Sequence, residues 1–125
     1  MLDRQHAAHV EVLILADRVV DSTRVLFDRV SFFADDDKIA EARRAHQETF
    51  SAIHAGKGAA QLAGPEDLVY KLGNFMVALT KQYGLIEKYA ESNGAIGTYD
   101  ELSAAANEMD ETRTAYILAA QKLLK

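Results

Sequence analysis

The sequence predicts an all-α fold, an antiparallel up-down-up-down four-helix bundle. Apolar residues recur at helical spacing along four long segments, and no segment shows the alternation of a half-buried strand. Helix-breaking residues are confined to the middle of the chain, since the only proline is Pro65 and all seven glycines lie between Gly56 and Gly97. A length of 125 residues fits a single domain over residues 1–125, and short connections make neighbouring helices antiparallel.

The first two helices are predicted over residues 3–33 and 36–60. The first has an apolar face so broad that neighbours are expected on more than one side. That face consists of Val10, Val12, Leu13, Leu15, Ala16, Val19, Val20, Phe27 and Val30. The run Asp35–Asp37 separates the two helices, because aspartate caps a helix N-terminus and suits the positive end of its dipole. The stripe of the second helix consists of Ile39, Ala42, His46, Phe50 and Ile53.

The last two helices are predicted over residues 65–91 and 99–124. Pro65 suits the first helical position, where its missing N–H costs nothing, and the third helix should stop near Ser92–Gly94. Thr98 and Glu101 have the spacing of a capping box before the fourth helix. The third stripe consists of Leu68, Leu72, Phe75, Met76, Leu79, Tyr83 and Ile86. The fourth consists of Leu102, Ala105, Met109, Tyr116, Ala120 and Leu123.

Composition and charge limit the partners that the protein is expected to have. The formal net charge of −5 disfavours nucleic acid, because phosphate backbones attract basic surfaces. No stretch approaches the roughly 20 apolar residues of a membrane span, and no basic-then-apolar segment indicates a signal peptide. The absence of cysteine excludes disulfides and cysteine metal sites. A cytoplasmic protein without nucleic-acid or membrane partners is therefore expected.

One segment, from His54 to Gly64, carries a motif with a specific chemistry. His54 is followed three residues later by Lys57 and then directly by Gly58. This motif resembles the signature of histidine-containing phosphotransfer (HPt) domains, in which a small residue, usually glycine, stands ten positions after the histidine. Gly64 occupies that position. Other matches to apolar positions of the family are Phe50, Ile53 and Leu68.

The resemblance implies a stand-alone phosphorelay intermediate, a phosphotransfer carrier rather than an autonomous kinase. His54 would accept a phosphoryl group from an aspartyl-phosphate receiver domain, or from a histidine kinase, and pass it to another response-regulator receiver domain. No cofactor is expected in this chain, because Mg²⁺ would belong to the partner receiver. The resemblance covers the whole chain in the order and length of the helices, and its specific part is the segment around His54.

The residue types around His54 suit phosphoryl transfer. An imidazole is a nitrogen nucleophile that is partly neutral near physiological pH. Residues three apart share a helix face, so Lys57 can reach a phosphate on His54. Gly58, which lacks a side chain, would let the loops of a partner approach closely. Gln61, one turn further, could donate a hydrogen bond. Supporting or docking roles are also expected for Gly56 and Gly64.

The sequence departs from the HPt pattern at several positions. Gly56 stands where the family commonly has a larger apolar residue, which suggests lost packing, and Pro65 replaces an alanine or a larger apolar residue. In chemotaxis kinases the third helix supplies a histidine and a glutamate, but here Gly73 and Met76 stand at those positions. A degenerate, non-phosphorylated member of the family therefore stays open. So does a non-catalytic helical interaction or sensory bundle in which His54 is an ordinary surface residue.

The remaining histidines predict no metal site. His6 and His9 are three residues apart on one helical face, but no second pair of ligands stands at a recognised spacing. Both are interpreted as part of a solvated helix end. His46 lies on the apolar stripe of the second helix, so it is expected at the edge of the core.

Overall fold

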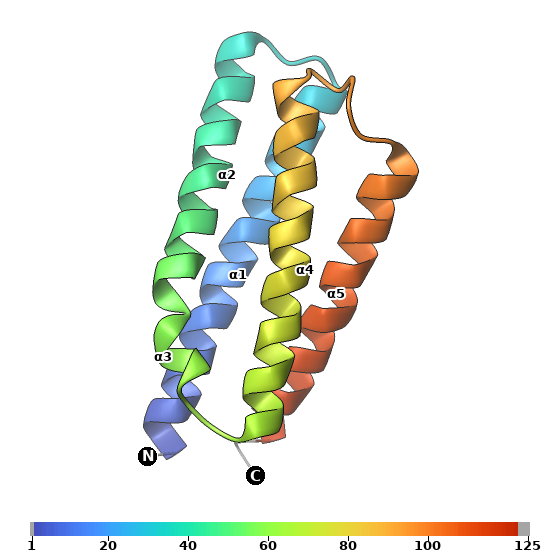
Figure 1. The fold of residues 1–125 in the computed structure, drawn as a ribbon. Coiled ribbons are helices and arrows are strands. Elements are labelled where there is room, and N and C mark those ends of the chain that lie inside the picture. The colour runs from blue at the N-terminus through green and yellow to red at the C-terminus, as the bar shows by residue number, and fades with distance from the viewer. Residues whose placement is uncertain (1, 123–125) are drawn as a thin grey trace.

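The computed structural model describes residues 2–122, and it is all-helical over that range, with no strand. Its elements are α1 (Leu2–Ser31), α2 (Asp36–Gly56), the single-turn α3 (Gly58–Gln61), α4 (Glu66–Glu91) and α5 (Tyr99–Gln121). Figure 1 shows the four long helices side by side. The α1–α2 and α4–α5 connections lie at one end, and the path from α2 through α3 to α4 lies at the other. The predicted all-α fold with four long helices is confirmed.

Side-chain caps define where two of the helices begin. The carboxylate of Asp35 accepts a hydrogen bond of 2.9 Å from the backbone N–H of Lys38, which places the cap of α2 one residue before Asp36. The hydroxyl of Thr98 accepts one of 3.1 Å from the N–H of Glu101, as the capping-box spacing predicts. Pro65 is the N-cap of α4 rather than its first residue, so the helix begins at Glu66, one residue later than predicted.

The second helix is shorter than predicted. It ends at Gly56, Lys57 forms a bend, and the chain resumes as α3, so the continuous helix over residues 36–60 is wrong. Glycines flank Lys57 on both sides, and each lowers helix stability by about 1 kcal/mol relative to alanine. The bend carries α3 inward, where Ala60 is fully buried in the core.

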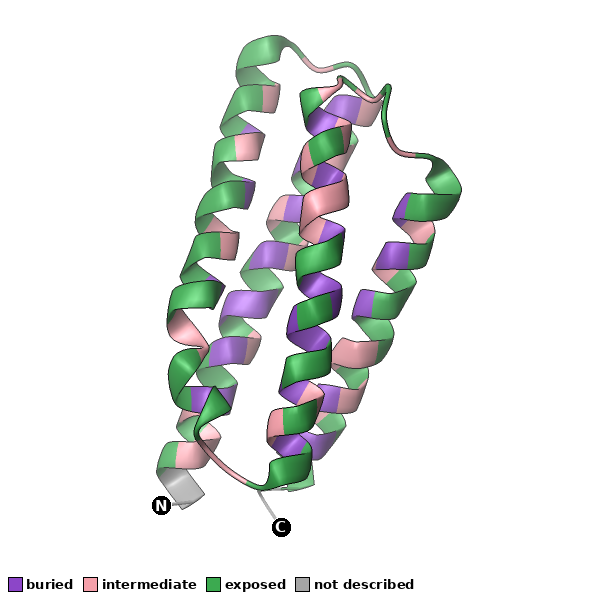
Figure 2. Cartoon of the chain, in the orientation of Figure 1, coloured by how far each residue is buried: buried purple, intermediate pink, exposed green. Residues whose placement is uncertain are grey.

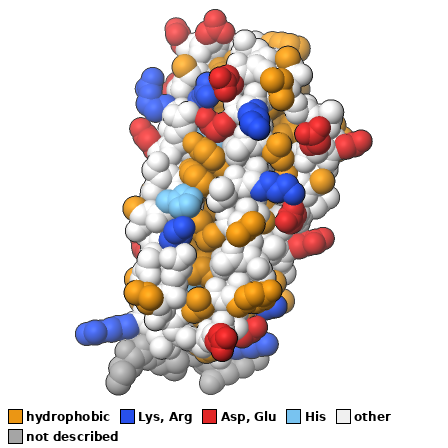
Figure 3. Space-filling view, viewed as in Figure 1, with side chains coloured by type: hydrophobic (Ala, Val, Ile, Leu, Met, Phe, Trp, Pro, Cys, Tyr) orange, Lys and Arg blue, Asp and Glu red, His pale blue; other side chains and the backbone are white. Residues whose placement is uncertain are grey.

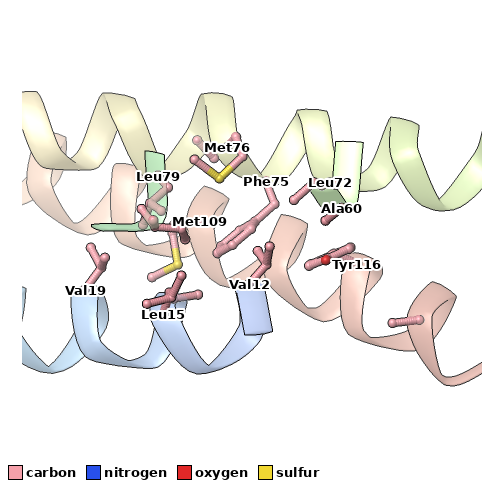
Figure 4. Close-up of a cluster of buried hydrophobic side chains, with 14 of the residues drawn as sticks. Val12, Leu15, Val19, Ala60, Leu72, Phe75, Met76, Leu79, Met109 and Tyr116 are labelled. Atoms are coloured by element: carbon pink, nitrogen blue, oxygen red, sulfur yellow. The ribbon is translucent and has the colours of Figure 1, made fainter. Parts of the chain in front are cut away.

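The hydrophobic core consists of two clusters along the bundle. Figure 4 shows the larger one, in which side chains of α1, α3, α4 and α5 point toward one another. Its labelled members are Val12, Leu15, Val19, Ala60, Leu72, Phe75, Met76, Leu79, Met109 and Tyr116. The smaller cluster consists of Leu26, Val30, Ala42, Ile86, Ala90 and Leu102. Burial of each large apolar side chain contributes about 1.5–3 kcal/mol, so these clusters supply the main driving force for the fold.

The broad apolar face of α1 is confirmed, with one exception. The helix contacts α2, α3, α4 and α5, and Leu13 and Val20 pack against the core beside the fully buried Val12. Val10, however, is 37% exposed, so its assignment to the buried face is wrong. At about 100° per residue, Val10 points roughly 160° away from Val12.

The burial pattern of all four long helices is amphipathic. In Figure 2 buried positions lie on the sides of the helices that face one another, and exposed positions lie on the outer surface. No helix within residues 2–122 has both the length and the apolar character that crossing a membrane requires. The predicted Leu123 lies outside the described residues.

Candidate functional site

His54 lies on the surface near the end of α2, and its ring packs against the ring of Phe50. Its ring meets that of Phe50 edge-on, with centroids 4.5 Å apart and planes at 70°. Phe50 in turn stacks on Tyr83 of α4, at 3.8 Å and 10°. Among residues 4–122, no side chain or carbonyl forms a hydrogen bond with a ring nitrogen of His54. The ring is therefore positioned by packing, while its nitrogens stay available to an incoming group.

The surroundings of His54 favour the neutral imidazole. Partial burial against its neighbours lowers the pKa of His54 below its ordinary value of 6.5, and the positive charge of Lys57 lowers it further. A neutral ring has one nitrogen with an available lone pair, which is the form that attacks phosphorus. Lys57 is half-buried at the bend between α2 and α3, so its ammonium acts on His54 through space rather than through a direct bond.

Two glycines that flank Lys57 have opposite environments. Gly58 is exposed, and a Cβ atom added there would meet no other atom within 4 Å. Gly56 is half-buried, and a Cβ atom there would lie 2.6 Å from Cδ1 of Leu15 on α1. Packing is thus not lost at Gly56, because Leu15 fills the space that a larger residue would take. Gly56 therefore lies where α2 packs closely against α1, whereas Gly58 lies on the open side of the site.

Gln61 and Gly64 lie beyond the bend and serve the turn into α4. Gln61 is exposed and lines a shallow surface depression together with Leu62 and Tyr70, and no hydrogen bond joins it to His54 within the described chain. Gly64 has a φ of 95°, a left-handed conformation that glycine adopts without strain. Of the residues predicted at the site, the chain therefore gathers His54, Lys57 and Gly58, and places Gln61 and Gly64 in the neighbouring turn.

His46 is a buried histidine with both ring nitrogens occupied. Its exposed fraction is 0%, its Nδ1 lies 2.8 Å from Oε2 of Glu87, and its Nε2 lies 3.0 Å from Oγ1 of Thr23. The second oxygen of Glu87 also accepts hydrogen bonds from Arg43 (3.0 Å) and Gln47 (2.7 Å). The expectation of a core-edge histidine is confirmed, and its network joins α1, α2 and α4.

The ionisation of this network follows from burial and hydrogen bonding. Burial lowers the pKa of His46, and the hydrogen bond and charge of Glu87 oppose that effect in part. Burial alone would raise the pKa of Glu87, but the hydrogen bonds it accepts, together with the charge of His46, outweigh burial and lower it. A neutral His46 therefore donates from Nδ1 to the Glu87 carboxylate and accepts at Nε2 from the Thr23 hydroxyl.

A continuous aromatic column connects the two histidines of α2. His46 stacks on Tyr83 at 4.7 Å, Tyr83 stacks on Phe50, and Phe50 contacts His54. We name His46, Tyr83, Phe50 and His54 the aromatic column. The sequence places Phe50 and Tyr83 on apolar stripes of different helices, but it does not show that these stripes meet beneath His54. Within the column, Phe50 and Tyr83 form the floor of the candidate site.

His9 contradicts the interpretation of a solvated helix end. It is 1% exposed, with Nδ1 2.7 Å from the Tyr116 hydroxyl and Nε2 2.9 Å from the carbonyl of Ala63. Since a carbonyl only accepts, Nε2 donates and Nδ1 accepts from Tyr116, a phenol whose pKa burial raises. His9 thus ties α1 to α5 and to the turn before α4. Among the described residues no three potential ligands gather as a metal site.

The surface beside the aromatic column is apolar rather than charged. Figure 3 shows hydrophobic side chains along the middle of the face formed by α2 and α4, next to a histidine, with charged side chains mostly around them. Ala55 and Ala59 are exposed near His54 and add only small side chains. A low, mainly apolar surface suits a transient protein contact.

Comparison of the chain with protein-family models, with curated proteins and with solved structures finds no match. Function is therefore inferred from the geometry of residues 2–122. In this structure His9 and His46 are buried, and both ring nitrogens of each form hydrogen bonds. His54 instead is exposed and lies close to Lys57, and its pKa is lowered.

Proposed function

We propose that this protein is a phosphorelay intermediate in two-component signal transduction. His54 accepts a phosphoryl group from an aspartyl-phosphate receiver domain, or from a histidine kinase, and passes it to another receiver domain. The observation that carries the proposal is the exposed ring of His54, held against Phe50, with Lys57 beside it and the open position Gly58 next along the chain.

The transfer is an in-line displacement at phosphorus. The unprotonated nitrogen of the neutral His54 ring forms a P–N bond while the P–O bond to the partner's aspartate breaks, and the carboxylate leaves with the electron pair. Phosphoryl transfer depends mainly on positioning and charge stabilisation. Packing against Phe50 supplies the positioning from this chain, and the ammonium of Lys57 supplies charge near the phosphoryl oxygens. Mg²⁺ belongs to the receiver in this proposal.

Docking of the receiver is proposed on the face of α2 and α4 that surrounds His54. A phosphate donor and acceptor must come into line, so the surface there must be low and open. Ala55, Gly58 and Ala59 are exposed small residues, which supports this choice of face. We infer an up-down-up-down topology for the bundle from the ends at which the connections lie. The proposal includes a cytoplasmic location, consistent with a chain without cysteine.

The test uses two phosphate donors and one matched variant. The full chain is incubated with radiolabelled phosphoramidate, which phosphorylates reactive histidines directly, and separately with receiver domains phosphorylated by acetyl phosphate in Mg²⁺. Phosphate that is acid-labile and base-stable is expected on wild type and absent from His54→Gln. Labelled wild type should then lose its phosphate to an unphosphorylated receiver. If no phosphohistidine forms with either donor, the relay is excluded and the non-catalytic interaction bundle is preferred.

A further inference from the structure

The end of the bundle opposite His54 exposes two adjacent phenylalanines. Phe32 and Phe33 directly follow α1 and are 80% and 89% exposed. The α4–α5 connection lies at the same end (Figure 1) and exposes Ile96 and Tyr99. We name these four residues the apolar tip. Large apolar side chains scattered singly over a surface are ordinary, but a group of them marks a site of contact with another molecule.

Tyr89 of α4 lies between the two connections that form the apolar tip. Its hydroxyl is 2.8 Å from Oγ of Ser31, the last residue of α1. Its ring also lies beside Gly94 and Gly97, where an added Cβ atom would be 3.6 Å from a ring carbon. Ser31 and Gly97 each directly adjoin an exposed residue of the apolar tip. The two parts of the tip therefore flank the same tyrosine and belong to one surface.

The backbone at Phe33 is strained, with a φ of 56°. Phe33 occupies the left-handed position of a Schellman turn, in which the N–H of Ala34 donates to the carbonyl of Arg29 (2.9 Å) and its own N–H to that of Val30 (3.3 Å). Glycine or asparagine is usual at such a position, and α4 ends in the same type of turn with Asn93 at a φ of 52°. Phe33 thus strains the backbone while burying almost no apolar surface, so local folding does not account for it.

The charges beside the apolar tip determine which partner fits it. Asp28 lies just before the turn, and Asp36 and Asp37 lie just after it. All three are exposed, and none forms an ion pair within residues 4–122. The two basic residues between positions 28 and 38 are Arg29 and Lys38, and the guanidinium of Arg29 donates to the carbonyl of Lys38 at 2.8 Å. At the upper end of Figure 3 acidic side chains lie beside hydrophobic ones. Anionic lipid, nucleic acid and a second copy of this surface would all meet like charge.

We propose that the apolar tip docks a basic, amphipathic segment of a partner protein. Its apolar side chains pack against Phe32 and Phe33, and its lysines or arginines lie beside the three aspartates, which gives the complementary charge that specific interfaces use. Along α2, Asp36 and His54 are about 27 Å apart at a rise of about 1.5 Å per residue. A partner held at the tip therefore leaves His54 accessible, and the proposal does not depend on phosphorylation.

The test uses a fluorescein-labelled peptide in which pairs of leucine and lysine alternate, and a second peptide with glutamate in place of lysine. Anisotropy titration with the full chain should show saturable binding of the lysine peptide, weakened by added salt, and no binding of the glutamate peptide. In the ¹⁵N-labelled chain the NMR shifts should be confined to residues 28–38 and 95–101. The signals of His54 and its neighbours should not move.

One substitution separates docking from folding. In Phe33→Asn the new residue suits the left-handed backbone, so the variant should melt at or above the wild-type temperature. Its affinity for the lysine peptide should nevertheless fall at least about tenfold, as expected when an aromatic anchor is lost. Leu118→Asn removes an exposed apolar side chain of α5 and is the matched control, with wild-type affinity expected. The pair Asp36→Asn and Asp37→Asn should weaken binding and reduce its dependence on salt.

Several outcomes would overturn the proposal. No saturable binding of the lysine peptide, or wild-type affinity in Phe33→Asn, would remove the apolar tip as its docking site. A dimer in sedimentation velocity that Phe33→Asn abolishes would assign the tip to a second copy of the chain. Cosedimentation with phosphatidylcholine vesicles, lost in the same variant, would assign it to a membrane surface. None of these results bears on phosphorylation of His54, which lies at the other end of α2.

Discussion

Two histidines on one helix, His46 and His54, differ in almost every respect that matters for chemistry. Both belong to α2 and to the same aromatic column. His46 is fully buried and bonded to Glu87 and Thr23, so both of its nitrogens are occupied. His54 is exposed and held by ring packing alone. The difference shows that hydrogen-bond partners at both nitrogens hold the ring of His46, whereas His54 is held by ring packing alone and could offer a nitrogen to an incoming group.

The electrostatics of the two sites follow the same contrast. Burial is the first cause of a lowered pKa at both histidines. At His46 the second influence is the carboxylate of Glu87, which opposes burial, and at His54 it is the ammonium of Lys57, which adds to burial. The carboxylate of Glu87 thus favours the protonated form of His46, whereas the ammonium of Lys57 favours the neutral form of His54.

The sharpest way to break this comparison is to replace His54, the proposed phosphate acceptor. His54→Gln should abolish phosphate acceptance, because the amide has no nucleophilic ring nitrogen. The side chain is exposed, so the midpoint of thermal unfolding should stay within about 2 °C of wild type. Phosphorylation with labelled phosphoramidate, read beside a circular dichroism melt, measures both. Undiminished labelling of a folded His54→Gln protein would show that another residue is the acceptor.

The reciprocal substitution should affect stability rather than phosphorylation. His46→Leu removes a buried ring that bonds two other helices, and it should lower the free energy of unfolding by about 2–4 kcal/mol. Urea titration measures this loss, and labelling at His54 in the folded variant should stay near wild type. A loss of stability below about 0.5 kcal/mol would mean that the network of His46 contributes little to the fold.

The same network makes the stability of wild type depend on pH. The pKa of His46 is below 6.5 in the folded protein, so the unfolded chain binds that proton first as pH falls. The contribution of His46 is therefore complete above pH 6.5 and decreases from there down to its folded pKa. Glu87, whose pKa is also lowered, adds a loss in the same direction below pH 4.5. In His46→Leu the slope just below pH 6.5 should become shallower.

The two glycines beside Lys57 provide a matched pair of smaller changes. Gly58→Glu should slow transfer from a receiver at least tenfold, through steric block and a negative charge beside the phosphate, with an unchanged circular dichroism spectrum. Gly56→Glu should instead lower stability by about 1–3 kcal/mol, because its side chain meets Leu15. Transfer at the wild-type rate by folded Gly58→Glu would exclude this docking face.

The sequence predicts the helices well because their causes are local. Apolar periodicity and caps such as Thr98 act within a few residues, and the observed ends of α4 and α5 lie close to the predicted ones. The motif also leads to His54 and Lys57, whose exposure and proximity depend on a single helix end. The bend at Lys57 was missed because the two glycines beside it lower the stability of the helix there, and the periodicity of apolar residues does not measure that stability.

The contacts that sequence analysis misses are long-range. His9 is buried by Tyr116 and Ala63, which are 107 and 54 residues away along the chain. Likewise the stack of Phe50 on Tyr83 depends on how α2 packs against α4. A pattern on one helix cannot show which residue of another helix will face it, so the support beneath His54 is visible only in the fold.

Lys57→Ala should have the smallest effect. It tests the contrast between the charged neighbours of His46 and His54. Removing the ammonium should raise the pKa of His54 toward its ordinary value, because one of the two causes of its depression is lost. Transfer to His54 should slow about fivefold without being abolished, as expected of a half-exposed charge that contributes about 1 kcal/mol. Titration of the His54 ring protons by NMR gives the pKa, and single-turnover labelling gives the rate.

The conservative variant separates charge from shape at this position. Lys57→Arg keeps the positive charge and should leave the pKa of His54 and the transfer rate close to wild type, whereas Lys57→Met keeps the length and should behave as Lys57→Ala does. The rate difference between wild type and Lys57→Ala should narrow in high salt, because screening weakens an exposed charge. A pKa of His54 that does not move in Lys57→Ala would remove Lys57 from the proposed site and leave ring packing as the only support of the proposed nucleophile.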